Sequence, residues 1–509
     1  MAPVFPSSLI HALEAAPDVP AFEQGPRVVL RCEALELIAR YVGGLQARGL
    51  QPRDKTAVYT SVTPEGFAVQ IAAHVLGLCV VVLKPGLTVA QIIRVIADVQ
   101  SLIVDEAIYT TLSPAVLATN KIVQLCDVAG DAVPLVPQGR LGDVGVVMYT
   151  SGSTGEPKGV RFTYAALTAC WSWQRDVWTP DVERLAARYT RFLLFGTLGS
   201  RVMSNHLGLC LIAGGTAVIP LAAAAPAIPE VLAELRITAV LFTVPRLSHV
   251  LHFLTTPQGR HLDLSALRSI LVAGSPLPAH TLRAAIARFG DVVSQGYGTS
   301  ETGMLSLLTA SDVAAHSETV SSVGRAWNGV EIDVRDDTGS RVSSPGTVGH
   351  IWVRTPSAFC EYTDEDASKV LGEGGWVWTQ DQGSLDARGY LYLAGRSRDV
   401  VIINAIVHYV GAIESALASH PAVDAAYVVA VPDEKTGEAA CAFVVPVRGG
   451  RADHGLEIED LRLRVKERLG VTAVPAVITC IDYIPVAPSG KPDKKAMLSL
   501  LMGQRNGSS

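Results

Sequence analysis

Short runs of apolar, β-branched residues alternate with amphipathic segments along the first half of the chain. Such runs predict buried strands, and the helical spacing of apolar positions between them predicts helices. The expected strands lie at 56–60, 80–83, 101–104, 217–219, 239–242 and 270–272. The expected helices lie at 65–76, 89–99, 231–235 and 246–253. Strands joined by crossover helices of this length predict parallel sheets that helices cover on both faces.

The second half of the chain has a different pattern of glycines and apolar residues. From about Val320 onward, glycines punctuate short alternating segments, which predicts a small antiparallel, β-barrel-like region. A compact tail follows Arg396 and begins with an apolar stretch at 402–410. It has two expected helices at 411–418 and 456–469 and two expected strands at 425–431 and 441–447. We therefore predict an α/β protein with a large N-terminal domain at 1–396 and a small α+β domain at 397–509.

The composition is that of a folded protein. Of the 509 residues, 49% are hydrophobic, and the formal net charge is −6 with dispersed Lys and Arg residues. A chain without a basic stripe gives no indication of nucleic-acid binding. The longest apolar segment, 68–83, is interrupted by Gln70 and His74 and is too short to span a bilayer. Because the start also lacks a signal-peptide pattern, we expect a cytoplasmic protein with no membrane segment.

Cysteine and histidine spacing gives little sign of a structural metal. The eight cysteines are spread singly without a CxxC pair, so we expect buried free thiols in a reducing compartment and not disulfides or zinc. His249 and His252 have the spacing of a metal-binding pair. On an amphipathic helix, however, such a pair is more often a packing feature.

The run from Tyr149 to Val160, YTSGSTGEPKGV, carries the clearest chemical signal. It follows the apolar stretch 144–148 and combines hydroxyls, glycines and Lys158, which predicts a loop that holds a polyphosphate, since successive backbone N–H groups form a concave anion site. It is not a Walker loop, because Gly159 follows the lysine where that motif needs Ser or Thr. A surface linker is the alternative, but it leaves the lysine and the preceding strand unexplained.

Four further motifs lie far apart along the chain: GYGTSETG at 296–303, WTQD at 378–381, GRSRD at 395–399 and PSGKPDKK at 488–495. Together and in this order, the five motifs resemble those of the adenylate-forming superfamily. This superfamily contains acyl-CoA ligases, standalone amide-forming ligases and peptide-synthetase adenylation domains. The resemblance covers approximately residues 20–500. It implies a core at 1–396 that binds ATP and the acid, and a mobile cap at 397–509.

The resemblance implies a role for individual residues of each motif. The residues expected at the β- and γ-phosphates of ATP are Thr150, Ser151, Gly152, Ser153, Thr154, Gly155 and Lys158. Those expected around adenine and ribose are Gly274, Ser275, Pro276, Tyr297, Gly298, Asp381 and Arg396. Ser300 would contact the α-phosphate, and Glu301 would bind Mg²⁺. Lys491 would bridge the substrate carboxylate and the α-phosphate. Without the order of the motifs, Asp381 would read equally well as a turn residue and Arg396 as part of a surface ion pair.

The charges of the reactants explain why such a site is needed. A carboxylate that attacks the α-phosphate meets electrostatic repulsion, and Mg²⁺ and Lys491 would offset this charge while pyrophosphate leaves. In the family, the cap rotates between the two half-reactions about a hinge, which corresponds to Arg398 here. This rotation would withdraw Lys491 and bring in the loop 403–410.

The expected acid pocket is formed partly by the segment 195–215. Relatives that activate amino acids carry an aspartate there, whereas this segment has no acidic residue and has Arg201 at about that position. A buried ammonium without a partner would cost several kcal/mol, so we expect an aryl, heteroaryl or acyl acid. The expected lining residues are Phe195, Val202, Met203, His206, Leu207 and Phe242. His206 would either bond the acid or be a satisfied core residue, and the sequence leaves both open.

The acceptor of the acyl group is less well specified. Asn404 and Ala405 stand where relatives that use CoA commonly have paired glycines, and a methyl group there could narrow a pantetheine tunnel. We therefore favour an amine acceptor, with CoA as the alternative and a carrier-protein thiol as a third option that nothing indicates. A non-catalytic binding protein is disfavoured by the intact Glu301, Asp381 and Lys491, and no feature favours a luciferase-type oxygenase.

Overall fold

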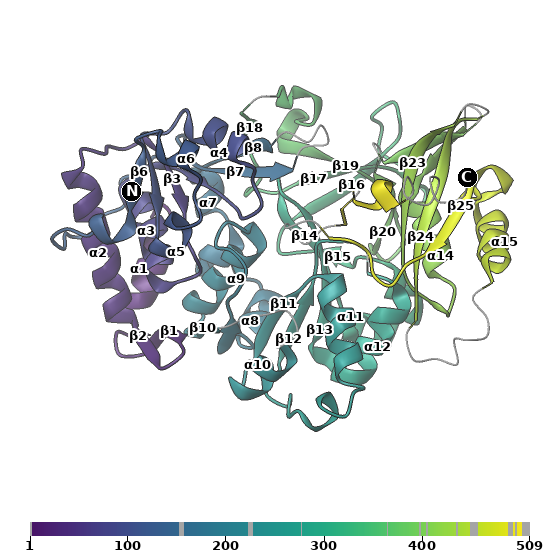
Figure 1. Ribbon diagram of the computed structural model, residues 1–509, viewed down its shortest axis with the longest axis horizontal. Coiled ribbons are helices and arrows are strands. Elements are labelled where there is room, and N and C mark those ends of the chain that lie inside the picture. Colours follow the sequence, from purple (N-terminus) through teal and green to yellow (C-terminus); the bar gives the residue numbers. More distant parts are fainter. Residues whose placement is uncertain are drawn as a thin grey trace.

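The computed structural model describes residues 3–151, 157–221, 228–275, 277–363, 365–396, 399–403, 406–433, 436–447, 457–486, 492–493 and 496–500. Within these residues the strands form two large sheets and two smaller ones. Figure 1 shows the chain running from the first large sheet on the left to a small C-terminal unit on the right.

The first large sheet has the strand order β18-β8-β7-β4-β3-β5-β6. The strands from β7 to β6 in this order run parallel, whereas β8 and β18 add antiparallel at one edge. The bounds are β3 Lys55–Tyr59, β4 Cys79–Val82, β5 Ser101–Val104, β6 Ile122–Gln124, β7 Val144–Ser151, β8 Pro157–Thr163 and β18 Glu361–Tyr362.

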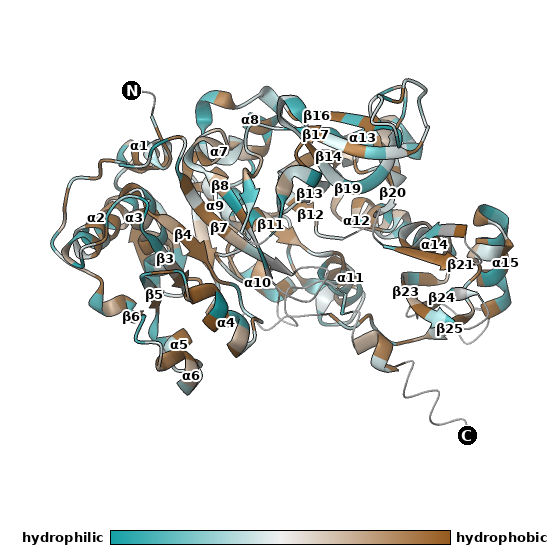
Figure 2. Cartoon of the chain, turned by 90° about the horizontal axis from the view of Figure 1, so that it is seen from above, coloured by the Kyte–Doolittle hydropathy of each residue, from teal (hydrophilic) through white to brown (hydrophobic). Residues whose placement is uncertain are grey.

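Strand β4 shows why this sheet is covered on both faces. Its sequence CVVV is buried at every position, as expected for a central parallel strand. Val80 and Val82 pack into the same core as residues of α3, while Cys79 and Val81 pack with residues of α4. Figure 2 shows this strand in hydrophobic brown between the two helices.

The second large sheet has the order β15-β14-β13-β12-β11-β9-β10-β1-β2. Strands β13 to β1 in this order are parallel, and β15, β14 and β2 are antiparallel additions. The bounds are β1 Pro20–Gln24, β2 Arg27–Leu30, β9 Arg191–Leu193, β10 Thr216–Ile219, β11 Ala239–Phe242, β12 Ser269–Val272, β13 Val293–Thr299, β14 Gly303–Thr309 and β15 Arg325–Ala326.

The predicted antiparallel region is confirmed as a four-stranded sheet with the order β16-β17-β19-β20. Its strands are β16 Glu331–Arg335, β17 Gly349–Arg354, β19 Trp376–Leu385 and β20 Leu391–Arg396. The last strand leads into the C-terminal unit, where β21 Val400–Ile403, β22 Ile406–Tyr409, β23 Val423–Asp433, β24 Gly437–Pro446 and β25 Val477–Cys480 form the remaining sheet.

The C-terminal unit has its own buried core. Val401, Ile413, Val444 and Leu461 belong to it, and none of its members is shared with the large core, whose last member is Leu391. Residues 397 and 398, where we placed the domain boundary, lie outside the described residues. The boundary itself therefore stays a prediction.

The helices connect and cover these sheets, and several begin at sequence signals that explain them. Thr63 caps α3 by accepting a hydrogen bond from Gly66 N–H, and Thr88 and Gln91 form a capping box at α4. The bounds are α1 Ser7–Glu14, α2 Arg31–Ala47, α3 Pro64–Val75, α4 Val89–Ile96, α5 Glu106–Tyr109, α6 Pro114–Leu117, α7 Tyr164–Thr168, α8 Pro180–Ala186, α9 Arg201–Ile212, α10 Ile228–Glu234, α11 Val244–Phe253, α12 Ala279–Phe289, α13 Ala310–Ala315, α14 Val410–Ala418 and α15 Ile458–Leu469.

The mixed α/β architecture agrees with the sequence prediction, but two features differ from it. The sheets are not purely parallel, because hairpins such as β7–β8 and β13–β14 add antiparallel edge strands. The N-terminal strand β1 was not predicted, yet it pairs parallel with β10 through Phe22 and Ala217. A pairing between residues so far apart leaves no local sequence signal.

The described residues contain no helix that combines the length and apolar character needed to cross a bilayer. All eight cysteines are free, as predicted. Their expected burial is wrong for three of them, because Cys32, Cys126 and Cys480 are exposed.

Arg31, the first residue of α2, is a charged residue inside the large core. Its side chain is only 1% exposed and donates hydrogen bonds to the carbonyls of Ala12 at 3.0 Å, Leu211 at 3.1 Å and Gly215 at 3.1 Å. Burial lowers its pKa from the ordinary arginine value. This guanidinium thus ties α1 and the end of α9 to the start of α2.

We expect Arg31→Met to destabilise the fold by about 1–3 kcal/mol, because it leaves three carbonyls without their donor. Thermal denaturation of the purified variant measures this loss. Arg27→Met is the matched control, since Arg27 is an exposed partner of Glu65 and its loss should change stability by less than about 0.5 kcal/mol. Equal melting temperatures for the wild type and Arg31→Met would contradict the assignment.

Candidate active site

The predicted site elements meet at the carboxyl ends of the parallel strands. The loop after β7, the turn after β13, and the segments after β12, β11 and β9 all leave their sheets at this edge. Crevices outside the carboxyl ends of parallel strands are the usual ligand sites of α/β folds.

The predicted phosphate loop connects the antiparallel strands β7 and β8. Their register pairs Thr150 with Lys158 and Ser151 with Pro157. The residues between them, among them Gly152, Ser153, Thr154 and Gly155, lie outside the described residues, as do the side chains of Thr150 and Ser151. Their phosphate contacts therefore stay predictions, and Lys158 is the loop residue whose side chain can be described.

Lys158 is held in place by an aromatic ring and a carboxylate. Its ammonium nitrogen lies 3.2 Å from the centroid of the Tyr362 ring and 2.6 Å from Oε2 of Glu365. The lysine side chain is 12% exposed, and that of Glu365 is 48% exposed. A cavity of about 210 Å³ opens beside them and is also lined by Lys369 and Gln380. A carboxylate thus already pairs with the ammonium group of Lys158.

The turn after β13 joins the two large sheets. Tyr362, on β18 of the first sheet, donates a hydrogen bond from its hydroxyl to Oε1 of Glu301 at 3.1 Å. The backbone carbonyl of Glu301 also accepts from Phe359 N–H at 2.8 Å. One tyrosine therefore contacts both Lys158 and Glu301, the predicted phosphate and metal residues.

Arg201 fixes the same turn from the other side. Its guanidinium donates to the carbonyl of Ser300 at 3.1 Å and to that of Ser357 at 2.7 Å. It also lies over the ring of Phe162 at 4.1 Å. Burial lowers the pKa of Arg201, and the attraction of Glu301 opposes this shift. Arg201 thus holds the turn through two backbone carbonyls.

Glu301 fits a metal that arrives with a nucleotide. The described residues contain no group of three or more His, Cys, Asp or Glu side chains that could hold an ion. Mg²⁺ is usually bound through one or two carboxylates plus substrate phosphates. A single carboxylate next to the phosphate-loop lysine matches that donor set.

Asp381 and Tyr297 form a buried pair between the second large sheet and the four-stranded sheet. The Tyr297 hydroxyl donates to Oδ2 of Asp381 at 2.6 Å, and the two residues are 9% and 5% exposed. Asp381 is level with Arg396 in the β19–β20 register, although the side chain of Arg396 is not described. The expected adenine and ribose residues thus contact each other directly.

The glycines of the adenosine motifs have two different explanations. Gly274, two residues past the end of β12, has a φ of +100° and open space where a Cβ would lie. At Gly298, a Cβ would meet the carbonyl oxygen of Gly303 at 2.1 Å. The tight β13–β14 hairpin therefore requires glycine at 298 without any ligand. Ser275 is described beside Gly274, whereas Pro276 is not.

The expected acid-pocket residues gather around α9 and the ends of β9 and β11. Phe192 of β9 pairs with Ala239 of β11, so Phe195, just past β9, and Phe242, the last residue of β11, stand at the carboxyl ends of neighbouring strands. The other expected residues lie on α9, where Val202 is partly buried and the remaining ones are buried: Met203, His206 and Leu207.

His206 is packed into the core but is not fully satisfied there. Its Nδ1 lies 2.8 Å from the Val202 carbonyl, and its ring packs against Trp171 and Tyr189. Burial lowers the pKa of His206 to about 4, so the imidazole is neutral at physiological pH. The Nε2 atom is buried without a partner.

Two features of the site have no counterpart in the sequence analysis. Tyr362 and Glu365 stand in the segment EYTDED, and β18 is only two residues long, so the contact with Lys158 leaves no local pattern. Gln380, next to Asp381, has a φ of +65°, which is uncommon for a residue other than glycine. Lys491, Arg398, Asn404 and Ala405 lie outside the described residues, and their roles stay predictions.

A larger hollow of about 920 Å³ lies at the amino ends of β9, β11 and β12. Arginines line it, but they are engaged: Arg188 with Asp291, Arg191 with Glu23, and Arg268 with backbone carbonyls. It is on the opposite edge of the sheet from the motifs, so its size does not make it the active site.

Comparisons with known proteins agree on one family. A family model described as AMP-binding enzyme matches residues 10–363, and one described as AMP-binding enzyme C-terminal domain matches residues 412–491. The chain is 30% identical over 491 residues to a feruloyl-CoA synthase from an Amycolatopsis species, covering 95% of this chain and 96% of that one. The amide bond synthetase McbA from Marinactinospora thermotolerans has a similar structure, with 28% identity, a TM-score of 0.84, and 97% and 99% coverage. A fatty acid–acyl-carrier-protein ligase from Streptomyces coeruleorubidus is 30% identical over 352 residues, covering 68% of this chain and 65% of that one.

The contact between Tyr362 and Glu301 generates a prediction about metal binding. In Tyr362→Phe the ring under Lys158 stays, but the hydroxyl that orients Glu301 is lost. Loss of such an outer partner typically weakens metal affinity about 10–100-fold. We expect the Mg²⁺ concentration needed for ATP to raise the melting temperature to increase at least tenfold, as a thermal-shift titration would show.

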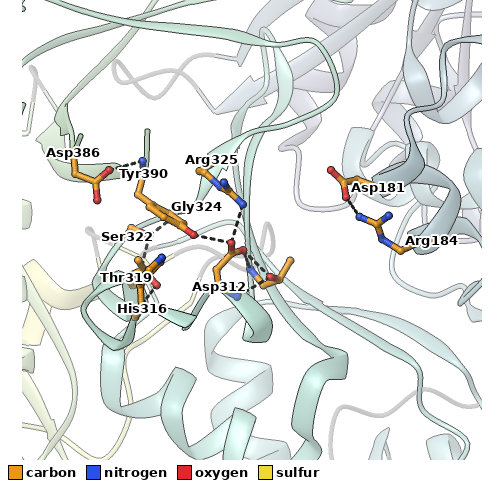
Figure 3. A network of polar contacts seen from close by, with 11 residues as sticks. Asp181, Arg184, Asp312, His316, Thr319, Ser322, Gly324, Arg325, Asp386 and Tyr390 are labelled. Atoms are coloured by element: carbon orange, nitrogen blue, oxygen red, sulfur yellow. Dashed lines mark hydrogen bonds and ion pairs between the residues drawn. The ribbon is translucent and has the colours of Figure 1, made fainter. Parts of the chain in front are cut away.

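Tyr390→Phe is the matched control, because its hydroxyl bonds a carboxylate oxygen of Asp312 at 2.8 Å, and no labelled residue of this network belongs to a motif (Figure 3). This variant should keep the Mg²⁺ requirement of the wild type. If both variants shift the requirement equally, or neither does, Tyr362 has no specific role in orienting Glu301.

Proposed function

This chain belongs to the AMP-binding enzyme family of AMP-forming ligases, and we propose that it joins an aryl, heteroaryl or acyl carboxylic acid to an amine through an acyl-adenylate. The coarser activity, ATP-dependent activation of a carboxylic acid, follows from the family. The acid class, the acceptor and the roles of single residues are our proposals.

The observation that carries the proposal is the junction of Lys158, Tyr362 and Glu301. The Lys158 ammonium lies 3.2 Å from the centroid of the Tyr362 ring, and Oε1 of Glu301 lies 3.1 Å from the Tyr362 hydroxyl. A cation and a carboxylate from different sheets thus contact one tyrosine. The cation suits the outer phosphates of ATP, and the carboxylate would hold a Mg²⁺ ion that offsets their charge. Asp381, buried in the adjoining sheet, is the candidate partner of the ribose hydroxyls.

Charge determines what the residues do during the first half-reaction. The acid carboxylate attacks the α-phosphorus, a P–O bond forms, and the bond to the β-phosphate oxygen breaks to release pyrophosphate. Lys158 would take up charge on the departing phosphates, and Lys491 would bring the carboxylate and α-phosphate together. Mg²⁺, when bound at Glu301, supplies further charge neutralisation.

The second half-reaction needs a different arrangement. We propose that residues 397–509 form a cap that rotates on the core 1–396 about Arg398. Lys491 would then leave the site, and the acceptor would attack the acyl carbon and expel AMP. The separate buried cores on either side of this boundary support such a movement.

The acid is proposed to lack an α-ammonium group. The segment 195–215 has no acidic residue to pair with one, and Arg201 within it is bonded to the carbonyls of Ser300 and Ser357. Phe195, Phe242, Met203 and Leu207 would instead provide an apolar surface for a ring or acyl chain.

An amine is the acceptor that we favour, with CoA as the alternative. Ala405 stands where relatives that use CoA commonly have glycine, and McbA, with 99% of its chain covered, is named an amide bond synthetase. The feruloyl-CoA synthase relative supports the alternative. A product analysis decides between them: the enzyme is supplied with ATP, Mg²⁺, a panel of aryl acids and either CoA or simple amines. We expect mass spectrometry to detect an amide. Detection of a thioester without any amide would show that CoA, and not an amine, is the acceptor.

Lys491→Ala separates the two half-reactions. We expect acyl-adenylate formation to fall by roughly 10²–10³-fold, since one preorganised charge is lost, while the reaction of a supplied acyl-adenylate with the acceptor is largely kept. Pyrophosphate exchange and single-turnover transfer measure the two steps. Lys494→Ala, in the same basic run, is the control and should affect neither step. An equal loss of both steps in Lys491→Ala would contradict the role of Lys491.

A further inference from the structure

Arg246 lies next to the expected acid pocket, although neither the motifs nor the resemblance assigns it a role. It is the third residue of α11, which begins just after the carboxyl end of β11. Its guanidinium carbon lies 4.6 Å from the centroid of the Phe195 ring. Phe195 follows the carboxyl end of β9, and Phe242 ends the neighbouring strand β11. Arg246 therefore borders the apolar surface on which the acid is proposed to lie.

Arg246 lacks the partners that other arginines at this sheet have. Within the described part of the chain it makes no hydrogen bond or ion pair, whereas Arg191 pairs with Glu23 through both carboxylate oxygens and Arg201 bonds two carbonyls. The side chain is partly buried, and burial lowers its pKa from the ordinary value. A cation withdrawn from water without an anion is costly, so this arrangement favours a negatively charged ligand.

The nitrogens of Arg246 are also accessible. Nε of Arg31 is buried without a hydrogen-bond partner, whereas no nitrogen of Arg246 is buried in this way. No acidic side chain competes for them locally, since neither α11 nor the segment 195–215 contains Asp or Glu. A guanidinium presents paired donors that match the two oxygens of a carboxylate.

The strand order indicates which end of the acid Arg246 would meet. Strands β13, β12 and β11 are consecutive neighbours, so α11 starts two strand spacings from the strand that carries Tyr297, about 10 Å away. The reacting carboxylate must lie at the α-phosphate, near Ser300 and Glu301. A benzene ring with carboxylates at opposite positions covers part of this separation, and the extended Arg246 side chain covers the rest.

We propose that Arg246 is a specificity residue that binds a second anionic group at the far end of the acid, so that the preferred substrates are aromatic dicarboxylates. This inference rests on the proposed function and names the substrate class of the same site. The near carboxylate is adenylated, while the distal carboxylate stays ionised against the guanidinium and the ring packs along Phe195 and Phe242.

The test compares matched acids and matched variants. Initial rates of ATP–pyrophosphate exchange are measured for benzoate and terephthalate, and for cinnamate and 4-carboxycinnamate. We expect the wild type to have the higher kcat/KM for each dicarboxylate. Arg246→Gln should lower the kcat/KM for the dicarboxylates about tenfold to a hundredfold relative to the monoacids. Arg246→Lys should retain part of the preference because it keeps the charge.

Arg260→Gln is the control, since Arg260 is exposed beyond the end of α11 and its side chain donates to the Thr255 carbonyl. It should keep the preference of the wild type. A wild type that prefers the monoacids, or an Arg246→Gln variant that changes both acids equally, would overturn the inference.

Calorimetric binding of the same acids distinguishes the inference from the proposed function. Binding of dicarboxylates that weakens in Arg246→Gln, without any exchange activity in the wild type, would support the inference and reject acid activation. Exchange activity with no dependence on a distal carboxylate would support acid activation and reject the inference.

Discussion

The turn between β13 and β14 is the point on which the arrangement of the site depends, because three sheets are bonded together around it. Glu301 is tied to the first large sheet through Tyr362, and Tyr297 is tied to the four-stranded sheet through Asp381. Arg201 holds the carbonyl of Ser300 from α9. Because each bond comes from a different element, the candidate metal, ribose and phosphate residues keep fixed positions relative to one another. Preorganisation of this kind lowers the cost of assembling charges when a substrate binds.

Electrostatics connects these contacts to the proposed chemistry. The reaction brings a carboxylate to a triphosphate, so the site needs cations that are not permanently paired with acidic side chains of the protein. Lys158 meets this need with Glu365, a partly exposed carboxylate that a phosphate could displace. Arg246 meets it by having no acidic partner among the residues that the structure describes. Glu301 alone cannot form a complete metal cage, so an ion would depend on the nucleotide for its remaining ligands.

Local patterns predicted much of the fold, whereas contacts between distant segments could not be predicted. The strand β4 and the helix α3 followed from apolar runs and the helical spacing of apolar positions. The two-residue strand β18 has no such pattern, and so the meeting of Tyr362 with Lys158 was missed. Motif order identified Glu301 and Asp381 as candidates, but it did not indicate that tyrosines would hold both carboxylates. For His206, the sequence left two interpretations, and the structure shows one nitrogen at a backbone carbonyl and the other buried without a partner.

The central claim is that a substrate carboxylate attacks the α-phosphate of ATP in the crevice bordered by these sheets. Isotope transfer tests it most directly. The enzyme is given ATP, Mg²⁺, the acceptor and an acid whose carboxylate carries ¹⁸O at both oxygens, and the nucleotide product is analysed by mass. The account predicts AMP that contains one ¹⁸O atom, since the acyl–oxygen bond breaks when the acceptor attacks. Unlabelled AMP, or ADP accompanied by labelled phosphate, would contradict it.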